Sequence, residues 1–339
     1  VAAAPDPDPD PDPDPDPDPS PGSGVYGDID NKGQADLIVW RPDTQTFLSY
    51  SKEDQNDIQS DNLGASASEV PLVGDYDGNG KTDLVTWSAS DGLWTVQFDN
   101  GQRQNFTLGR SGDSPVVADV DGDGKHDPMV RRASSGSWHY LLSASDYRES
   151  QFSFVSEATD VPVLGNYDSD ARTDFAIWRN GRWFMRHSSD KQTRTRDLGT
   201  QADDIPVPAD YDGDGITDVG IFRPAKDGAS GRWIIYYSSG IYPEGGNRLE
   251  RNFGTLPEDV PVPADYDGDG KADIAFRPPS TGAFFVINSG NSQQIGTSFA
   301  AETTDIPVLA AWRSLQGFLT NGGSQGPGVA GDLDGNGQA

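Results

Sequence analysis

Aspartate residues recur in this chain at a spacing that suits a hard divalent cation. The pattern Asp-x-Asp-x-Asp-Gly-x-x-Asp occurs in six variants, about 45 residues apart. Short carboxylates at alternate positions of a tight loop can converge on one centre, and calcium takes six to eight oxygen ligands. Glycine at the sixth position permits the positive φ that folds the loop back, and the carbonyl of the seventh residue can supply another oxygen. The repeat therefore predicts calcium loops.

Five of these loops are expected to hold about five calcium ions. Magnesium prefers an octahedral, largely hydrated shell and zinc prefers His or Cys, so calcium is the better fit. One loop has the neutral amide of Asn166 at its first position and Ala171 in place of the turn glycine, and we still expect it to bind. The candidate ligands at positions one, three, five, seven (through its carbonyl) and nine are Asp75, Asp77, Asn79, Lys81 and Asp83; Asp119, Asp121, Asp123, Lys125 and Asp127; Asn166, Asp168, Asp170, Arg172 and Asp174; Asp210, Asp212, Asp214, Ile216 and Asp218; and Asp265, Asp267, Asp269, Lys271 and Asp273.

Two further loops are weaker candidates. The first loop of the chain carries Lys32 at its fifth position, and this ammonium can take the place of a cation. A fragment near the C-terminus starts the same pattern and stops before the ninth position. We expect both to be weak or empty. Their candidate ligands are Asp28, Asp30, Gln34 and Asp36 in the first loop and Asp332, Asp334 and Asn336 in the fragment.

The segments between the loops read as four short strands. In most repeats the loop is followed by an apolar run that ends in an aromatic residue, such as Leu37–Trp40 in the first repeat. A second run that contains aromatic residues comes next, such as Trp94–Phe98 in the second repeat. A third run closes on Leu-Gly or Phe-Gly, and a Pro-led run such as Val260–Val262 enters the next loop. Four strands per repeat predict an all-β fold, a β-propeller of about seven blades of four-stranded antiparallel sheet. Six repeats are clear, and an incomplete one begins at Ile306.

The recurring aromatic positions also suggest where the core lies. Because the tryptophans stand at fixed places in the repeat, we expect most of them to be buried between blades rather than to stack on sugars. The three histidines, His126, His139 and His187, stand beside no matched carboxylate or nucleophile at repeated positions. We therefore expect them to be isolated surface or loop residues.

The two ends of the chain differ from its middle. Residues 1–24 form a tail in which Pro and Asp alternate, which favours an extended linker, and residues 25–339 form the propeller. Residues 331–339 repeat the pattern of residues 27–35. Either the two ends share a blade and close the ring, or the spare strand pairs with a neighbouring subunit, or the chain is a fragment of a longer one. We favour ring closure, because it removes exposed sheet edges.

Composition limits the partners. The net charge of −29 argues against nucleic acid, whose phosphates are bound mainly by clustered Lys and Arg. The chain has no cysteine, and no run approaches the roughly 20 apolar residues of a membrane span, so we expect no membrane insertion. Extracellular calcium is high enough to fill weak sites, which favours a secreted, extracellular or cell-surface location. Val1–Ala4 is compatible with what remains after removal of a signal peptide.

These loops resemble the FG-GAP/VCBS family of bacterial secreted repeats and are similar to the calcium-loop blades of integrin α-subunit propellers. The resemblance rests on the run Pro-Val-Pro-Ala-Asp-Tyr-Asp-Gly-Asp-Gly at 261–270 and covers about residues 25–311. The Phe-Gly pair stands at 253–254 without the Gly-Ala-Pro portion, so the bacterial repeats are the nearer relation. The family implies a seven-bladed propeller whose calcium loops join the first two strands of each blade.

Three functions remain open at this point. The first is a non-catalytic adhesion or binding module for an extracellular protein or polysaccharide, with recognition on the face away from the calcium loops. The second is a structural subunit of an extracellular filament or matrix that self-associates through its termini. The third, a polysaccharide lyase or hydrolase, is disfavoured because no acid/base pair or nucleophile stands outside the repeat. The recognition loops would be Arg41 to Thr46, Gly109 to Ser114, Arg223 to Gly231, Gly254 to Asp259 and Arg277 to Gly282, with Ser238 to Asn247 adding Ile241 and Tyr242.

Overall fold

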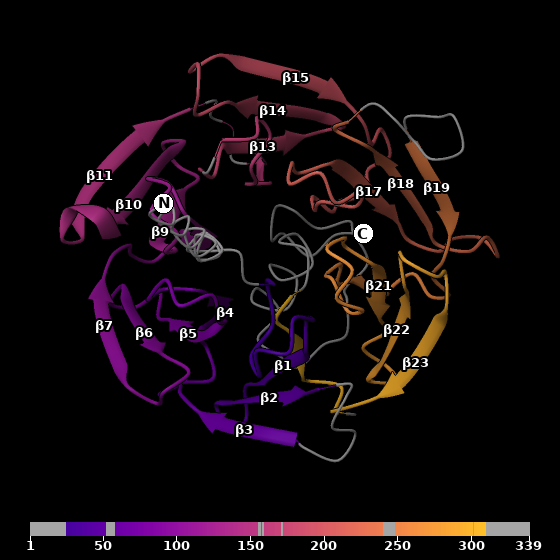
Figure 1. The fold of residues 1–339 in the computed structure, drawn as a ribbon, viewed down its shortest axis with the longest axis horizontal. Coiled ribbons are helices and arrows are strands. Elements are labelled where there is room, and N and C mark those ends of the chain that lie inside the picture. Colours follow the sequence, from indigo (N-terminus) through magenta and orange to yellow (C-terminus); the bar gives the residue numbers. More distant parts are fainter. Residues whose placement is uncertain are drawn as a thin grey trace, which may run out of the picture.

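The computed structural model describes residues 25–51, 58–154, 157, 159–170, 172–239, 248–300 and 302–309. Within these residues six sheets, each of four antiparallel strands, stand around a ring like the blades of a propeller (Figure 1). The tail, the C-terminal fragment with Asp332, Asp334 and Asn336, and the predicted contacts Ile241 and Tyr242 lie outside the described residues. The all-β propeller prediction is confirmed.

Each blade runs from an inner strand near the ring axis to an outer strand at the rim. A single turn of 3-10 helix, η1 (Ser143–Ser145), interrupts the third blade. In order from inner to outer strand, the blades are β24 (Ile306–Pro307), β1 (Leu37–Arg41), β2 (Thr46–Tyr50) and β3 (Ile58–Asn62); β4 (Val70–Gly74), β5 (Asp83–Trp87), β6 (Leu93–Gln97) and β7 (Arg103–Thr107); β8 (Asp113–Ala118), β9 (Asp127–Arg132), β10 (Ser137–Leu142) and β11 (Arg148–Ser153); β12 (Val161–Pro162), β13 (Phe175–Arg179), β14 (Arg182–Arg186) and β15 (Thr193–Asp197); β16 (Ile205–Pro206), β17 (Val219–Arg223), β18 (Arg232–Tyr236) and β19 (Arg248–Asn252); and β20 (Val260–Pro261), β21 (Ile274–Arg277), β22 (Ala283–Ile287) and β23 (Gln294–Ser298).

The sequence character of each strand follows its place in the blade. The second strand is covered on both faces by neighbouring blades, so β5 is apolar or aromatic at most positions and buried throughout. The third strand alternates, as β6 shows, and the outer strand β7 is mostly exposed and polar. This gradient from buried to exposed is what a radial stack of sheets requires, since only the rim meets solvent.

Tryptophans fill the space between blades. The indole N–H groups of Trp87 and Trp94 both donate to the carbonyl of Leu108, over 3.0 and 3.1 Å. Gly109 follows with φ +96°, and a Cβ there would lie 3.1 Å from the Trp87 ring, which explains the Leu-Gly ending of the third run. Every described tryptophan is buried, as predicted: Trp40, Trp87, Trp94, Trp138, Trp178, Trp183 and Trp233.

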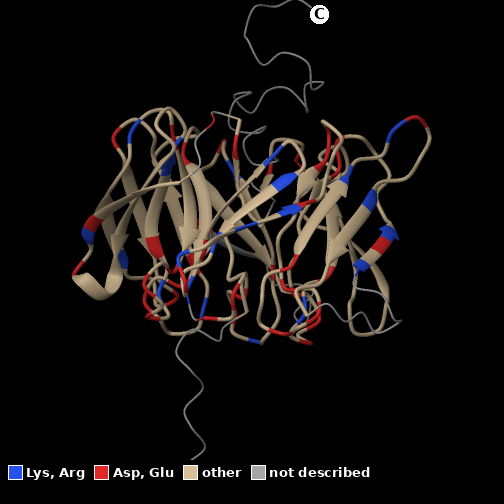
Figure 2. Ribbon diagram, turned by 90° about the horizontal axis from the view of Figure 1, so that it is seen from above, with Lys and Arg blue, Asp and Glu red and all other residues tan. Residues whose placement is uncertain are grey.

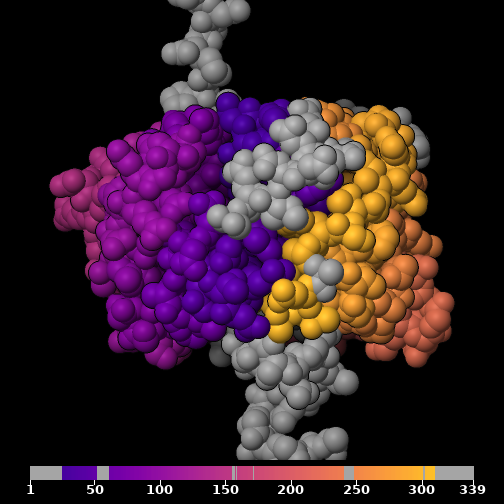
Figure 3. All heavy atoms as spheres, turned by 90° about the horizontal axis from the view of Figure 1, so that it is seen from below, coloured from indigo at the N-terminus to yellow at the C-terminus, as the bar shows by residue number. Residues whose placement is uncertain are grey.

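The ring closes by sharing its first blade between the two ends of the described chain. Strand β24 pairs with β1, with Ile306 opposite Trp40 and Pro307 opposite Val39. Figure 3 shows the first blade packed directly against the last one. The described residues therefore form six blades rather than the seven expected, because the run at Ile306 supplies the inner strand of the first blade instead of starting a seventh.

An arginine clamp supports this closure. Arg41, at the end of β1, donates two hydrogen bonds of 2.8 Å to the carboxylate of Asp305, which is fully buried just before β24. The same pairing, between the last residue of the second strand and an Asp at or just before the start of the inner strand, recurs in three other blades. Those pairs are Arg132 with Asp113, Arg179 with Asp160, and Arg223 with Asp204.

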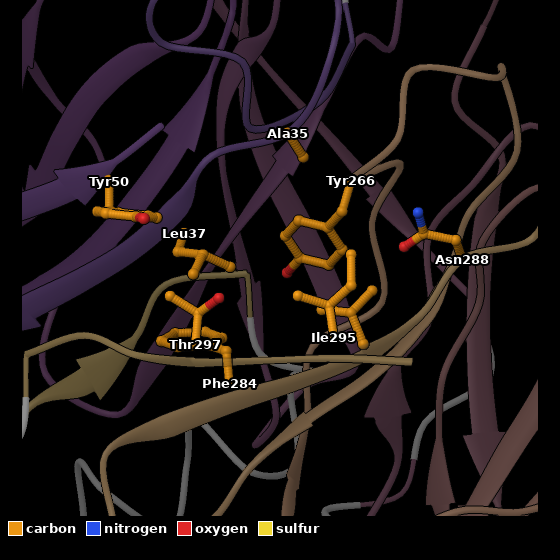
Figure 4. A pocket seen from close by; sticks show the side chains of 9 residues that line it. Ala35, Leu37, Tyr50, Tyr266, Phe284, Asn288, Ile295 and Thr297 are labelled. Carbon is orange, nitrogen blue, oxygen red and sulfur yellow. The ribbon is translucent and has the colours of Figure 1, made fainter. Parts of the chain in front are cut away.

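A small apolar cavity lies in the closing seam (Figure 4). Leu37 and Tyr50 line it from the first blade, and Tyr266, Phe284 and Ile295 line it from the sixth. Its volume is about 20 Å³. That is room for roughly one water molecule, so this cavity does not accommodate an organic ligand.

Replacement of Asp305 by Ala should destabilise the protein more than replacement of Asp204 by Ala. Both variants break the same kind of clamp beside an inner strand with two paired residues, but only β24 closes the ring between the two ends of the described chain. We expect Asp305→Ala to lower the free energy of unfolding by roughly 2–4 kcal/mol, since it removes the buried carboxylate that pairs with Arg41. Chemical denaturation of both variants measures this. Equal losses would contradict a special role for the closing clamp.

Candidate metal centres

The acidic loops each lead into the second strand of a blade, join it to the inner strand in five of the six blades, and gather at one end of the ring (Figure 2). The loop between β16 and β17, with Asp210 at its start, serves as the example. This placement agrees with the one that the family resemblance implies. Each position of the loop pattern has a distinct structural role.

The first aspartate folds the loop. Oδ1 of Asp210 accepts a hydrogen bond from the N–H of Gly213 at 2.7 Å, and Oδ2 accepts one from Gly215 at 2.8 Å. Both glycines have positive φ, at 78° and 81°. A residue with a Cβ adopts this conformation at a cost, which explains why the glycines recur. The equivalent aspartates Asp75, Asp119 and Asp265 accept the same pair of bonds.

The ninth aspartate ties the loop to the rest of the blade. Asp218 is fully buried, and its Oδ2 accepts the N–H of Tyr211 at 2.9 Å. Its Oδ1 accepts the N–H of Ser238, at 2.6 Å, from the turn that follows β18. Sequence analysis missed this serine, although a Ser stands at the same place after the third strand in several repeats. Ser143, Ser188 and Ser289 make the equivalent bond to Asp127, Asp174 and Asp273.

The fifth position links the loop to that same serine. Oδ1 of Asp214 accepts the N–H of Ile216 at 2.9 Å, and the hydroxyl of Ser238 donates to the same carboxylate. Four other loops have the same bond between the fifth and seventh positions. The N–H groups of Lys81, Lys125, Arg172 and Lys271 donate to the side chains of Asn79, Asp123, Asp170 and Asp269, in that order. In the second loop Asp99 replaces the serine and contacts Asn79 and Lys81.

The third aspartate has an oxygen left over. Oδ1 of Asp121 and Oδ1 of Asp212 are buried and have no hydrogen-bond partner among the described residues. An unsatisfied buried acceptor costs about 1–3 kcal/mol, and more when it is charged. Each of these aspartates belongs to a group in which carboxylate oxygens of positions one, three and nine lie within 4.8 Å of one another. A cation at that centre would satisfy the orphaned oxygen.

The raised pKa values of the loop carboxylates also favour a bound cation. Burial raises the pKa of Asp83, Asp127, Asp218 and Asp273 to about 7, and the pKa of Asp36 to about 6. Neighbouring carboxylates add to the rise, as Asp212 and Asp210 do for Asp218. A divalent cation stabilises the ionised form of such a cluster. The donors are all oxygens, so these residues fit calcium.

The first loop carries its own positive charge. The ammonium of Lys32, at the fifth position, lies 2.9 Å from Oδ2 of Asp30. Asp28 still accepts the N–H groups of Lys32 and Gly33 at 3.2 and 2.8 Å, so the loop has the same fold as the others. This geometry is the one expected if the lysine takes the place of a cation. Gln34, at the seventh position, and Asp36, at the ninth, complete the loop.

Successive loops are joined by one repeated hydrogen bond. The N–H of the eighth loop residue donates to the carbonyl of the first residue of the preceding loop, as Thr82 does to Asp28 at 3.0 Å. The sixth blade is joined to the first by Ala35, which donates to Asp265 at 2.6 Å. Six such bonds thus run around the whole ring. The other four join His126 to Asp75, Thr173 to Asp119, Thr217 to Asn166, and Ala272 to Asp210.

The histidines were predicted to be isolated surface or loop residues: His126 and His187 do lie in loops, but His139 lies in a strand, and all three contact neighbouring polar groups. His126 is an eighth-position residue whose Nδ1 accepts the N–H of Asp75 at 2.8 Å, between two loops. His139 is buried, and its Nε2 lies 3.0 Å from both the Arg132 guanidinium and the Ser137 hydroxyl. His187 is buried beside the fourth loop. No repeated pattern marked these positions, because each histidine occurs in one blade only.

Comparison with known proteins supports the fold. No family model matches the chain, and no curated protein is similar to it in sequence. Among solved structures, a streptogramin B lyase matches with a TM-score of 0.51 and 12% identity, over 84% of this chain and 86% of that one. A catalytically inactive virginiamycin B lyase from Staphylococcus aureus, with quinupristin, matches with a TM-score of 0.50 and 12% identity, over 84% and 87%. At this identity the similarity establishes the propeller fold alone. Of the described residues, none forms a helix long and apolar enough to cross a membrane.

Metal-free protein should become less stable as the pH rises from about 5 to 8. In the folded state the ninth-position carboxylates keep their protons up to a pKa of about 7, whereas the ordinary value is 3.8. The folded state therefore binds more protons within this window, and its advantage is lost as the pH passes the folded pKa. Thermal unfolding in chelator at several pH values measures this. A melting temperature that rises with pH in chelator would contradict the assignment.

Proposed function

We propose that this protein is a calcium-stabilised β-propeller that acts as a non-catalytic binding module outside the cell. The observation that carries the proposal is the repeated all-oxygen centre, in which the fold holds buried carboxylates close together and leaves third-position oxygens of Asp121 and Asp212 without a partner. Calcium fits the second, third, fifth and sixth loops, which carry aspartate at positions one, three and nine and Asp or Asn at position five. Secretion is part of the proposal, because extracellular calcium fills sites of moderate affinity.

Binding of a partner is proposed for the face opposite the metal loops. The turns between the second and third strands lie there, since the second strand starts at the metal end and runs away from it and the third strand returns. Arg41 and Arg223 border two of these turns, but their guanidinium groups are held by Asp305 and Asp204. Recognition of an extracellular protein or polysaccharide would therefore fall on the residues inside the turns, 42–45 and 224–231. Self-association through the termini is the alternative proposal, and it concerns residues outside the described part of the chain.

An enzymatic function has less support. The third- and ninth-position aspartates would be engaged by cations, and the cavity at the closing seam holds only about 20 Å³. The likeness to two lyases is a likeness of fold at 12% identity. Absence of turnover on acidic polysaccharides, in the presence of calcium, is the outcome that this proposal expects.

Substitution of Asp212 by Asn should remove one calcium site, whereas substitution of Asp30 by Asn should not. Both residues occupy the third position, but Asp30 already faces the Lys32 ammonium at 2.9 Å. Calcium at a hundredfold excess over its dissociation constant adds about 2.7 kcal/mol of stability for each site. We expect calcium to stabilise the Asp212→Asn variant by about 2.7 kcal/mol less than it stabilises the parent protein. Calorimetric titration combined with thermal unfolding measures both effects.

The matched pair also shows what would overturn the proposal. If Asp212→Asn and Asp30→Asn change the calcium stoichiometry equally, the assignment of sites is wrong. If neither variant nor the parent protein gains stability with calcium, the loops are not calcium sites. Light scattering of the same samples, with calcium and with chelator, separates a monomeric binding module from an assembling subunit.

A further inference from the structure

The fourth loop brings a histidine together with two aspartates, whereas the first, second, third and fifth loops each bring three aspartates together. Asp168, Asp174 and the imidazole of His187 each place a ligand atom within 4.8 Å of the others. His187 comes from the turn that follows β14, next to Ser188, so the third strand delivers it to the loop. The same place, one residue after the end of the third strand, is occupied by Tyr237 in the fifth blade and by Ser51 in the first.

His187 points into the loop without a hydrogen bond to hold it. Its side chain is only 10% exposed. Among the described residues its ring nitrogens make no hydrogen bond, and Nδ1 lies 3.6 Å from Oδ2 of Asp168. That separation exceeds a hydrogen bond. It is roughly the distance between two ligands of one tetrahedral ion whose bonds are about 2.0–2.2 Å long.

The two carboxylates are oriented by donors from outside the cluster. Oδ2 of Asp168 accepts the N–H and the hydroxyl of Ser189, at 3.1 and 2.6 Å. Asp174 is fully buried, and its oxygens accept the N–H groups of Ser188 and Tyr167 at 2.6 and 2.8 Å. Such outer contacts fix the direction of the remaining lone pairs, as they do around protein-bound metals.

The rest of the loop is less suited to calcium than its sister loops. Asn166 replaces the first carboxylate, and its amide group donates to the carbonyl of Asp170 at 2.6 Å. The loop therefore has one fewer anionic oxygen than the fifth loop and gains an imidazole nitrogen. Calcium takes oxygen ligands, whereas zinc and neighbouring transition metals favour imidazole together with carboxylate.

We propose that the fourth loop is a transition-metal site, of the zinc class, formed by Asp168, Asp174 and His187. The proposal rests on the proposed function only in treating the loops as cation sites, and it assigns this one loop a different ion. Three protein ligands leave a fourth position for water or for a ligand atom from a partner. The chain would then hold calcium and a transition metal in neighbouring blades.

A competing arrangement exists in the same molecule. Lys32 places a positive charge in the first loop, 2.9 Å from Asp30. A protonated His187 beside Asp168 would act in the same way and would leave the fourth loop without a metal. The two arrangements differ in whether a metal binds, so they can be separated by experiment.

The test exchanges the residue that distinguishes the fourth blade from the fifth. His187→Tyr gives the fourth blade the residue of the fifth, and Tyr237→His makes the reverse change. Binding of Zn²⁺ is measured by calorimetry in excess calcium, and Co²⁺ is used as a probe whose visible absorption reports a nitrogen-containing tetrahedral site. Asp190→Asn, which removes an exposed acid three residues from His187, is the control for loose binding to surface carboxylates.

We expect the parent protein and Asp190→Asn to bind one Zn²⁺ in the presence of calcium. His187→Tyr should weaken this binding by at least about 10- to 100-fold, the loss seen when even an outer contact of a metal ligand is removed. Tyr237→His should add zinc binding at the fifth loop. Circular dichroism and the calcium-dependent melting temperature of each variant show whether it is folded.

Three outcomes would overturn the proposal. In the first, the parent protein binds calcium but not Zn²⁺, which supports a protonated His187 that takes the place of a metal ion. Zn²⁺ affinity can be unchanged in His187→Tyr, which places the ion elsewhere. Calcium at moderate excess can displace Zn²⁺ from the parent protein, which makes the fourth loop an ordinary calcium site. Failure of the calcium proposal has a different signature, since calcium would then leave the melting temperature of every variant unchanged.

Discussion

The structure depends on how negative charge is arranged at one end of the ring. Six loops, each with several carboxylates, lie there, and the hydrogen bonds from each eighth-position residue to the preceding loop hold them together around the whole circle. The ninth-position aspartates cannot move into solvent, because each is buried and accepts the N–H of the second loop residue. In four blades the same aspartate also holds the serine that follows the third strand. The fold therefore places carboxylates close enough to repel one another. This negative charge must be neutralised by protonation of a carboxylate, by a lysine such as Lys32, or by a bound cation.

Much of the fold could be predicted from the sequence because each repeated sequence feature corresponds to a contact that is repeated in the blades. Apolar runs ending in Trp, the Pro-led strands and the Leu-Gly endings each reflect one contact that recurs in the blades, as the shared carbonyl of Leu108 shows. The number of blades could not be predicted in the same way. The run at Ile306 looks like the start of a new unit, and only its pairing with β1 shows that it completes the first blade. Pairing between residues so far apart leaves no local pattern.

The candidate site was predicted in part. The spacing of the acidic residues indicated which side chains meet, since alternate positions of a tight loop point to one side. The contributions of Ser238 and His187 were missed, because they come from a turn two strands later and only the fold brings them to the loop. The arginine clamps were missed as well. Arg41 and Asp305 are joined only by the closure of the ring. The other three clamps join residues 19 positions apart, a regular spacing that the sequence did contain.

The most direct test of this account is to count the metal ions on the folded protein by native mass spectrometry, before and after dialysis against a chelator. The account predicts at least four calcium ions per chain at neutral pH, one for each of the second, third, fifth and sixth loops, and a loss of folded protein as they are removed. A fully folded ring that carries no ions and is as stable in chelator as in calcium would contradict it. The buried carboxylates would then have to be neutralised by protons alone.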